Sequence, residues 1–195
     1  MKSSASHWWV LEGEYKMKPE PDVTEDMEQY DYIDTEYLDK NRRTYSPLIG
    51  SFLIDFSLLE HEIDIAIAEF VFDDAHEPGF LIISRLKTSD KIELLSKLYA
   101  AMAAGVGSKS IGALKKIKTR LTSATEFRNR LVHACWGTLS KGGLVRTKST
   151  VDEQDGRVKF RKARISPAVI RSWDAKVNRL ADHLTEYCDR VREGV

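Results

Sequence analysis

The chain has 195 residues, 42% of them apolar, and its 30 basic side chains balance its 30 acidic ones. This length suits one domain with an extension, and it is sufficient to bury a hydrophobic core. The charge is unevenly spread, because residues 1–46 hold six basic and eleven acidic side chains while residues 47–195 carry a net charge of +5. We therefore expect an acidic arm beside a basic body that suits an anionic partner.

Membrane and secretory segments are not expected. No uninterrupted apolar run approaches the length of a membrane span, and the apolar stretch at residues 7–11 is too short for a signal peptide. Cys135 and Cys188 both lie in helical patterns with apolar neighbours, which favours buried thiols over a disulfide. The sequence therefore predicts a cytoplasmic protein without a membrane partner.

Residues 1–46 show no sustained period and are interpreted as an acidic, partly ordered N-terminal extension. Tyrosines are interspersed among its acids, which argues against pure disorder and allows parts of it to pack on the body or on a second copy of the chain. A short helix near residues 35–42 is an open alternative within this extension. The domain that follows is expected to span residues 47–195.

The first long helix is predicted over roughly residues 47–72. Ser46 suits the N-cap position and Pro47 the first helical position. Apolar residues then recur at helical spacing from Ile49 to Phe70. Glu60 flanks this stripe and is the acid nearest to a neighbouring helix.

Two further helices follow. Start signals at residues 88–90 predict a second helix that ends at Gly105-Val106-Gly107, and a third helix runs from about Ser108 to His133. Residues 80–83 are ambiguous between a helical turn and buried coil. Steps of three and four residues predict a packed seam along the third helix, formed by Leu114, Ile117, Leu121, Ala124, Arg128, Leu131 and Cys135.

The segment 136–165 changes character. Gly142-Gly143 and Asp155-Gly156 are turn dipeptides, and they separate strands expected near residues 136–140, 144–151 and 157–164. Ser166-Pro167 then starts a last long helix. The predicted fold is all-α, an antiparallel four-helix bundle with a small β-hairpin or meander insert between the third and fourth long helices.

Residues 126–137 close the third helix with a concentration of polar side chains. Asn129 and His133 are four residues apart and share a face, which Glu126 and Arg130 border. Arg128 falls in the apolar seam, where an unpaired guanidinium would be very costly. Arg128 therefore needs either a partner carboxylate or a functional reason to be there.

The run from Arg128-Asn129 to His133 resembles the signature of HEPN domains, an arginine and a polar residue followed at short distance by a histidine. Members of that family are small antiparallel helical bundles, and many are metal-independent endoribonucleases of toxin–antitoxin, abortive-infection or CRISPR-associated systems. The resemblance implies a homodimer with a composite cleft at its two-fold interface, and an antitoxin or regulatory protein as a further partner. Some members carry a tyrosine two residues after the histidine, which a nucleotidyltransferase antitoxin modifies. Cys135 stands there in this chain, which argues against that route.

The residue types suit RNA cleavage. RNA carries its own nucleophile, the 2′-hydroxyl, and a histidine can act as its base or as the acid for the leaving oxygen. An arginine can stabilise the charge that develops on the phosphate, and an asparagine can orient the histidine or bond a phosphate oxygen. We therefore predict an endoribonuclease, a toxin or phage-defence effector, with catalytic residues Arg128, Asn129 and His133. No metal or other cofactor is expected, because no second histidine or carboxylate is spaced for coordination.

A structural interpretation is also open. Arg128 could pair with Glu60 in the core while Asn129 and His133 face water, as in ion-pair networks of other bundles. The chain would then be a non-catalytic helical module that binds RNA or a protein. A third hypothesis is that the acidic N-terminal arm covers the basic cleft of the body.

The β insert is basic, and it predicts a surface that follows the phosphates of RNA towards the motif. The residues expected to bind RNA are Arg130, Lys159, Arg161 and Lys162. The alternative is an ordinary strand edge that lysines protect from pairing with other chains.

Overall fold

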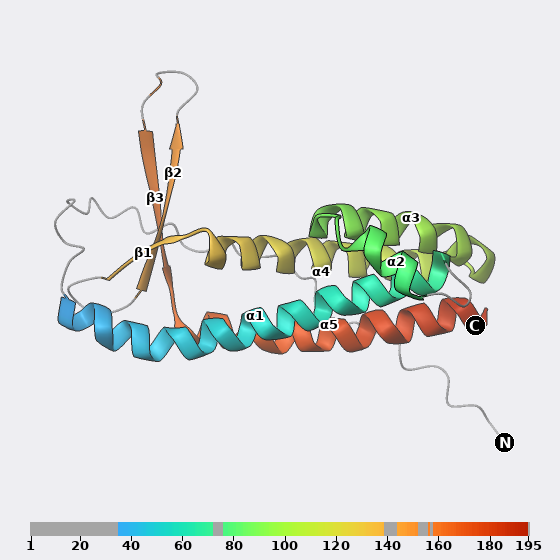
Figure 1. Cartoon of the computed structure of the whole chain (residues 1–195), viewed down its shortest axis with the longest axis horizontal. Helices are drawn as coiled ribbons and strands as arrows, with labels where there is room; N and C mark the ends of the chain where they lie inside the picture. Colours follow the sequence, from blue (N-terminus) through green and yellow to red (C-terminus); the bar gives the residue numbers. More distant parts are fainter. Residues whose placement is uncertain (1–34, 72–75, 139–143, 152–155, 157, 195) are drawn as a thin grey trace.

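The computed structural model describes residues 35–71, 76–138, 144–151, 156 and 158–194 (Figure 1). This part of the chain is mostly helical with one small antiparallel sheet. Its helices are α1 (Thr35–Val71), α2 (His76–Ile83), α3 (Thr88–Val106), α4 (Ser108–Val132) and α5 (Pro167–Glu193). Its strands are β1 (Cys135–Thr138), β2 (Leu144–Val151) and β3 (Val158–Ile165).

The two longest helices, α1 and α5, lie side by side and run in the same direction (Figure 1). Their polar contacts keep a constant offset of 123 residues, which two antiparallel helices could not do. These contacts join Ser51 to Asp174, Asn178 to Asp55, Thr185 to Glu62 and Arg192 to Glu69. The expectation of an antiparallel arrangement throughout is therefore wrong for this pair.

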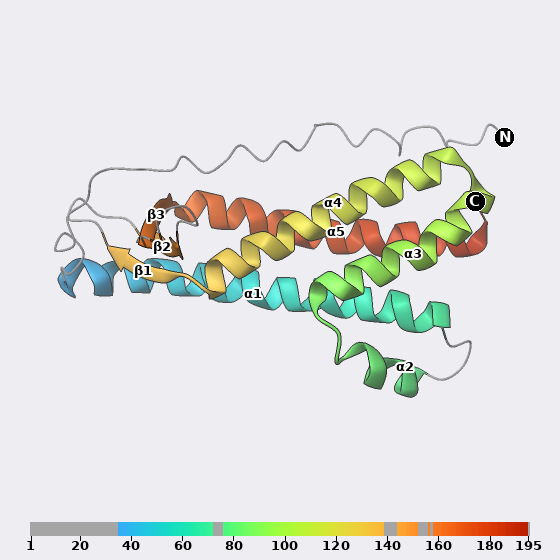
Figure 2. The same cartoon turned by 90° about the horizontal axis from the view of Figure 1, so that it is seen from above.

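The chain reaches this arrangement through α2, which packs beside the second half of α1 (Figure 2). His61 of α1 stacks on Phe80 of α2 with 5.9 Å between the ring centroids. The chain after α2 brings the start of α3 beside Glu60 of α1, and there the Thr88 hydroxyl donates a hydrogen bond to the Glu60 carboxylate. Helix α4 then carries the chain back towards the end at which α1 begins (Figure 2). Residues 80–83, which the sequence left ambiguous between a helical turn and coil, belong to α2 and are helical.

Helix α1 begins well before the predicted start. It runs continuously from Thr35, so Pro47 lies inside the helix and Ser46 is not its cap. An internal proline removes one backbone hydrogen bond and costs about 3 kcal/mol. Tertiary contacts oppose that cost, because Tyr45 is buried and its hydroxyl donates to the Ile165 carbonyl at 2.9 Å. The short helix considered near residues 35–42 is the first part of α1.

The remaining helix boundaries are confirmed. Helices α3 and α4 begin and end where glycines and start signals predict them. Ser166 caps α5, since its side chain accepts a hydrogen bond from the Val169 backbone N–H at 3.3 Å. Proline follows at the first position of this helix, as expected.

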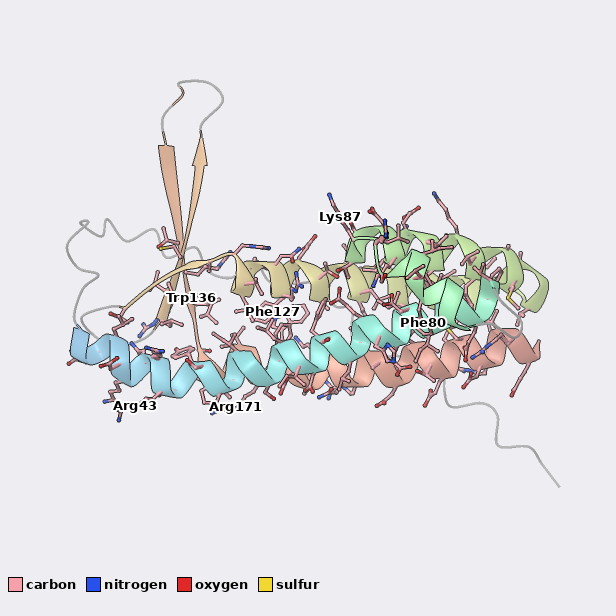
Figure 3. All side chains as sticks on the ribbon, viewed as in Figure 1. Arg43, Phe80, Lys87, Phe127, Trp136 and Arg171 are labelled. Atoms are coloured by element: carbon pink, nitrogen blue, oxygen red, sulfur yellow. The ribbon has the colours of Figure 1, made fainter. Side chains whose placement is uncertain are left out.

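The core beside the motif is aromatic. Phe127 of α4 is fully buried, stacks on Trp173 of α5 at 4.7 Å and meets the ring of Phe52 of α1 edge-on at 5.2 Å. Figure 3 places Phe127 on the side of α4 that faces α1. One aromatic side chain therefore joins α4 to both long parallel helices.

The predicted seam of α4 is correct for most of its length and wrong at its end. The buried apolar residues of this helix are Leu114, Ile117, Leu121, Ala124, Phe127 and Leu131. A three-residue step at Ala124 brings Phe127 into the core, so Arg128 is left half-buried at its margin. Cys135 lies in β1, beyond the helix, and is exposed.

The predicted strands form a sheet in the order β1-β2-β3. Strand β1 pairs with residues 144–147 of β2, whereas β3 pairs with β2 over its full length. The rest of β2 and β3 is therefore a two-stranded ribbon, which projects away from the helices (Figure 1). The β insert is confirmed as a meander between α4 and α5.

We expect Phe127→Ala to lower the free energy of unfolding by about 3–5 kcal/mol, because it leaves a cavity among three helices. Urea titration followed by circular dichroism measures this change. Ile54→Ala is the control, since Ile54 is 65% exposed on α1 and its truncation should cost under about 0.5 kcal/mol. Equal losses for the two variants would contradict this account of the core.

Candidate functional site

The candidate site lies where α4 ends. His133 directly follows the last helical residue, and its backbone N–H still donates to the Asn129 carbonyl at 3.0 Å. Its side chain and that of Asn129 are both exposed. The helix therefore presents the two residues one turn apart at its end, just before the chain turns into β1.

A pocket of about 510 Å³ opens beside these residues. It is lined by Glu126, Asn129, Arg130, His133, Ala134, Arg146 and Thr147. The structure thus brings together the pair predicted to share a face and the two charged residues predicted to border it. Volumes of this size are usual for pockets that bind small molecules.

Strand β2 supplies the part of the pocket that sequence reasoning missed. Trp136 pairs with Arg146 and Cys135 with Thr147, so β2 runs beside the chain that follows His133. Figure 3 shows Trp136 where β1 crosses the other strands. The sequence predicted both strands but not their register, because folding them about Gly142-Gly143 would pair Trp136 with residue 149, whereas it pairs with Arg146.

Arg128 does not line the pocket. Its guanidinium donates a hydrogen bond to the Asn129 side-chain carbonyl at 2.9 Å and lies over the ring of Phe56, 5.6 Å from the centroid. A cation above an aromatic face is attracted by the ring's electron density. Arg128 therefore connects α1 to Asn129 from behind the pocket.

The expected ion pair between Arg128 and Glu60 is not formed, although the structure describes both residues. Glu60 lies one turn beyond Phe56 on α1, and its carboxylate accepts a hydrogen bond from the Thr88 hydroxyl at the start of α3. Glu60 is therefore not the structural partner of Arg128 that the sequence predicted. The half-buried guanidinium of Arg128 is instead accommodated by an aromatic ring and an amide oxygen.

Arg130 lies on the opposite side of α4 from Arg128 and lines the pocket. Its guanidinium lies 5.9 Å from the centroid of the Phe127 ring, and its Nε donates to the Glu126 backbone carbonyl at 3.4 Å. The packing of this arginine thus depends on the buried aromatic core. The pocket is lined by two arginines, Arg130 and Arg146, and by one acidic residue, Glu126.

The three remaining residues expected to bind RNA are in β3. Lys159, Arg161 and Lys162 pair through the backbone with Thr150, Lys148 and Thr147. Their side chains lie outside the described residues. The register brings the backbone of Lys162 opposite a pocket residue, Thr147.

Both cysteines are free thiols. Cys188 is buried as predicted, and burial raises the pKa of its thiol to about 11, which leaves it protonated and unreactive. The predicted burial of Cys135 is wrong, because the helix ends at residue 132 and this thiol is exposed at the start of β1.

Within residues 35–71, 76–138, 144–151, 156 and 158–194, no group of three or more His, Cys, Asp or Glu side chains could hold a metal ion. None of the described helices combines the length and the apolar character needed to cross a membrane.

Comparisons with models of protein families, with curated proteins and with solved structures find no match to this chain. The resemblance to HEPN domains therefore depends on the motif, since the parallel pairing of α1 with α5 departs from the antiparallel bundle that the resemblance implies.

Proposed function

We propose that this chain is a metal-independent endoribonuclease of HEPN type, a toxin or phage-defence effector whose helices form a HEPN-like four-helix bundle. The observation that supports the proposal best is the pocket at the end of α4. It holds Asn129 and His133 together with the cations Arg130 and Arg146. An imidazole beside two guanidinium groups suits the cleavage of a phosphodiester.

In the proposed reaction, the 2′-hydroxyl oxygen of a ribose bonds to the adjacent phosphorus and the bond to the 5′-oxygen breaks. The products are a 2′,3′-cyclic phosphate and a 5′-hydroxyl. His133 removes the proton of the nucleophile or supplies the proton that the leaving oxygen takes up. The site is exposed, so water and substrate can reach the imidazole.

Asn129 and Arg128 act as a unit in this proposal. The side-chain carbonyl of Asn129 accepts a hydrogen bond from Arg128, which leaves the NH₂ group of Asn129 to donate to other partners. That group can donate to a phosphate oxygen as charge develops there. Arg128 thus acts through Asn129 within one chain, and Phe56 holds its guanidinium in place.

One histidine cannot serve as acid and base in the same step. We therefore propose a homodimer in which two copies of His133 share one cleft, as a two-fold axis allows. An antitoxin or regulatory protein would be a further partner. A non-catalytic module that binds RNA or a protein remains the alternative function, and the experiments below separate the two.

We expect His133→Ala and Arg128→Ala each to slow RNA cleavage by at least about a hundredfold, because one removes the proton-transfer group and the other the support of Asn129. Gel analysis of labelled RNA in EDTA measures the rate and the product ends. Melting temperatures should stay near that of the wild type, since His133 is exposed and Arg128 lies at the margin of the core. Arg179→Ala, an exposed change on α5, is the control.

If the wild-type chain cuts no RNA, the endoribonuclease is wrong and the binding module is favoured. If both variants cut RNA at the wild-type rate, the roles given to His133 and Arg128 are wrong. Activity lost only in proportion to unfolding would make the two residues structural. Inhibition by EDTA would exclude this mechanism.

We expect light scattering to report a dimer at micromolar concentration. Co-refolding the wild-type chain with excess His133→Ala chain should lower the activity per wild-type chain. The reason is that the shared cleft of a mixed dimer carries only one His133 in place of two. The same excess of Arg179→Ala chain should not lower it. A fully active monomer, or a constant activity per wild-type chain, would rule out a shared cleft.

We expect replacement of Lys159, Arg161 and Lys162 by glutamate to weaken RNA binding and to reduce its dependence on salt. Each lost phosphate contact on a single strand lowers the slope of log K against log salt by about 0.7, because fewer counterions are released. Fluorescence anisotropy at several salt concentrations measures this slope. An unchanged slope would mean that the basic ribbon is an ordinary solvated strand edge.

A further inference from the structure

Arg146 is a charged residue of the pocket that lies outside both α4 and the motif. It lies in β2 opposite Trp136, is half-buried and lines the pocket together with Thr147. Its backbone is paired on both sides, with Trp136 of β1 and with Ala163 of β3. A side chain on the central strand of a sheet is positioned more rigidly than one on a loop.

The charges of the pocket favour an anion. Arg130 from α4 and Arg146 from β2 supply two permanent positive charges, and Glu126 supplies one negative charge on an exposed side chain. A guanidinium presents parallel N–H donors that match two oxygens of a phosphate. Partial burial reduces the screening of such a pair by water.

Within one chain, Arg128, the arginine of the motif, does not line the pocket. Arg128 donates to Asn129 and lies over Phe56, on the far side of α4 from the pocket. A phosphate in the pocket would therefore meet Arg130 and Arg146 in the same chain before it met Arg128.

We propose that Arg146 binds a backbone phosphate of RNA in the pocket, together with Arg130, so that the β insert forms part of the substrate site. The choice of RNA as the ligand rests on the proposed function. A phosphate contact positions the strand and carries no base information. Arg146 thus determines where along the RNA the 2′-hydroxyl meets His133, and it does not select a sequence.

The test uses the full chain and a fluorescent single-stranded RNA, with single-stranded DNA of the same sequence as a probe that lacks the 2′-hydroxyl. Arg146→Gln keeps an unbranched stem and a polar head, but it is shorter and removes the charge and the fork. We expect it to weaken the binding of both probes about tenfold, because a charge-assisted contact to a phosphate is lost. Arg146→Lys should restore part of the affinity, and Arg179→Ala should bind as the wild type does.

The outcomes are separable from those of the proposed function. Unchanged binding by Arg146→Gln, with a wild-type melting temperature, overturns the inference whether or not RNA is cleaved. A loss for RNA without a loss for DNA also overturns it, since that result indicates a ribose contact. If neither the wild type nor any variant cleaves RNA but Arg146→Gln weakens both probes, the pocket binds phosphate and only the catalytic proposal fails. If Arg146→Gln lowers the melting temperature and Arg146→Lys binds no better, Arg146 is structural and the inference fails.

Discussion

The parallel pairing of α1 with α5 constrains the rest of the structure. Two helices that run in the same direction cannot be joined by a short turn, so the chain between them has to travel back to its starting end. Helix α4 makes that return, and the β meander connects its end to the start of α5. The end of α4, the sheet and the first turns of α1 therefore meet at one end of the molecule. Tyr45 joins them through its hydrogen bond to Ile165.

The rotation of α4 about its own axis is determined at Phe127. With this ring held between Phe52 and Trp173, residues on the opposite side of the helix must face outward. Asn129 and His133 occupy that outer side. Arg128 and Arg130 fall on the two flanks, where Phe56 and Phe127 offer aromatic faces to their guanidinium groups. Aromatic packing thus orients the polar motif and supports its cations.

The proposed chemistry depends on groups from two kinds of element. The helix presents the imidazole and the amide, and the sheet adds a guanidinium from a strand paired on both sides. A helix end and a central strand are both held by backbone hydrogen bonds, so the backbone that carries each of these groups is held in place. The basic ribbon of β2 and β3 continues from this point, which would allow an RNA strand to extend beyond the pocket.

The sequence by itself determined most of the elements and the residues of the motif. Helical and strand boundaries depend on local signals such as Ser166 with its proline, the glycines 105 and 107, and the dipeptide Gly142-Gly143. The early start of α1 was missed because Pro47 locally favours a helix start, whereas the burial of Tyr45 carries the helix through it. The sharing of one pocket by Asn129 and His133 was also predictable, since helical spacing alone places residues four apart on one face.

Only the tertiary structure decided which neighbours these residues meet. A spacing of three or four residues fits Phe127 and Arg128 equally well, and the packing of Trp173 and Phe52 selected the phenylalanine for the core. The partner of Arg128 depends on which turn of α1 lies beside it, and that turn carries Phe56 and not Glu60. The parallel direction of α5 and the entry of Arg146 into the pocket depend on how elements far apart in the chain assemble. Local patterns carry the period of each element, but the distances between elements arise from the burial of their apolar faces against one another.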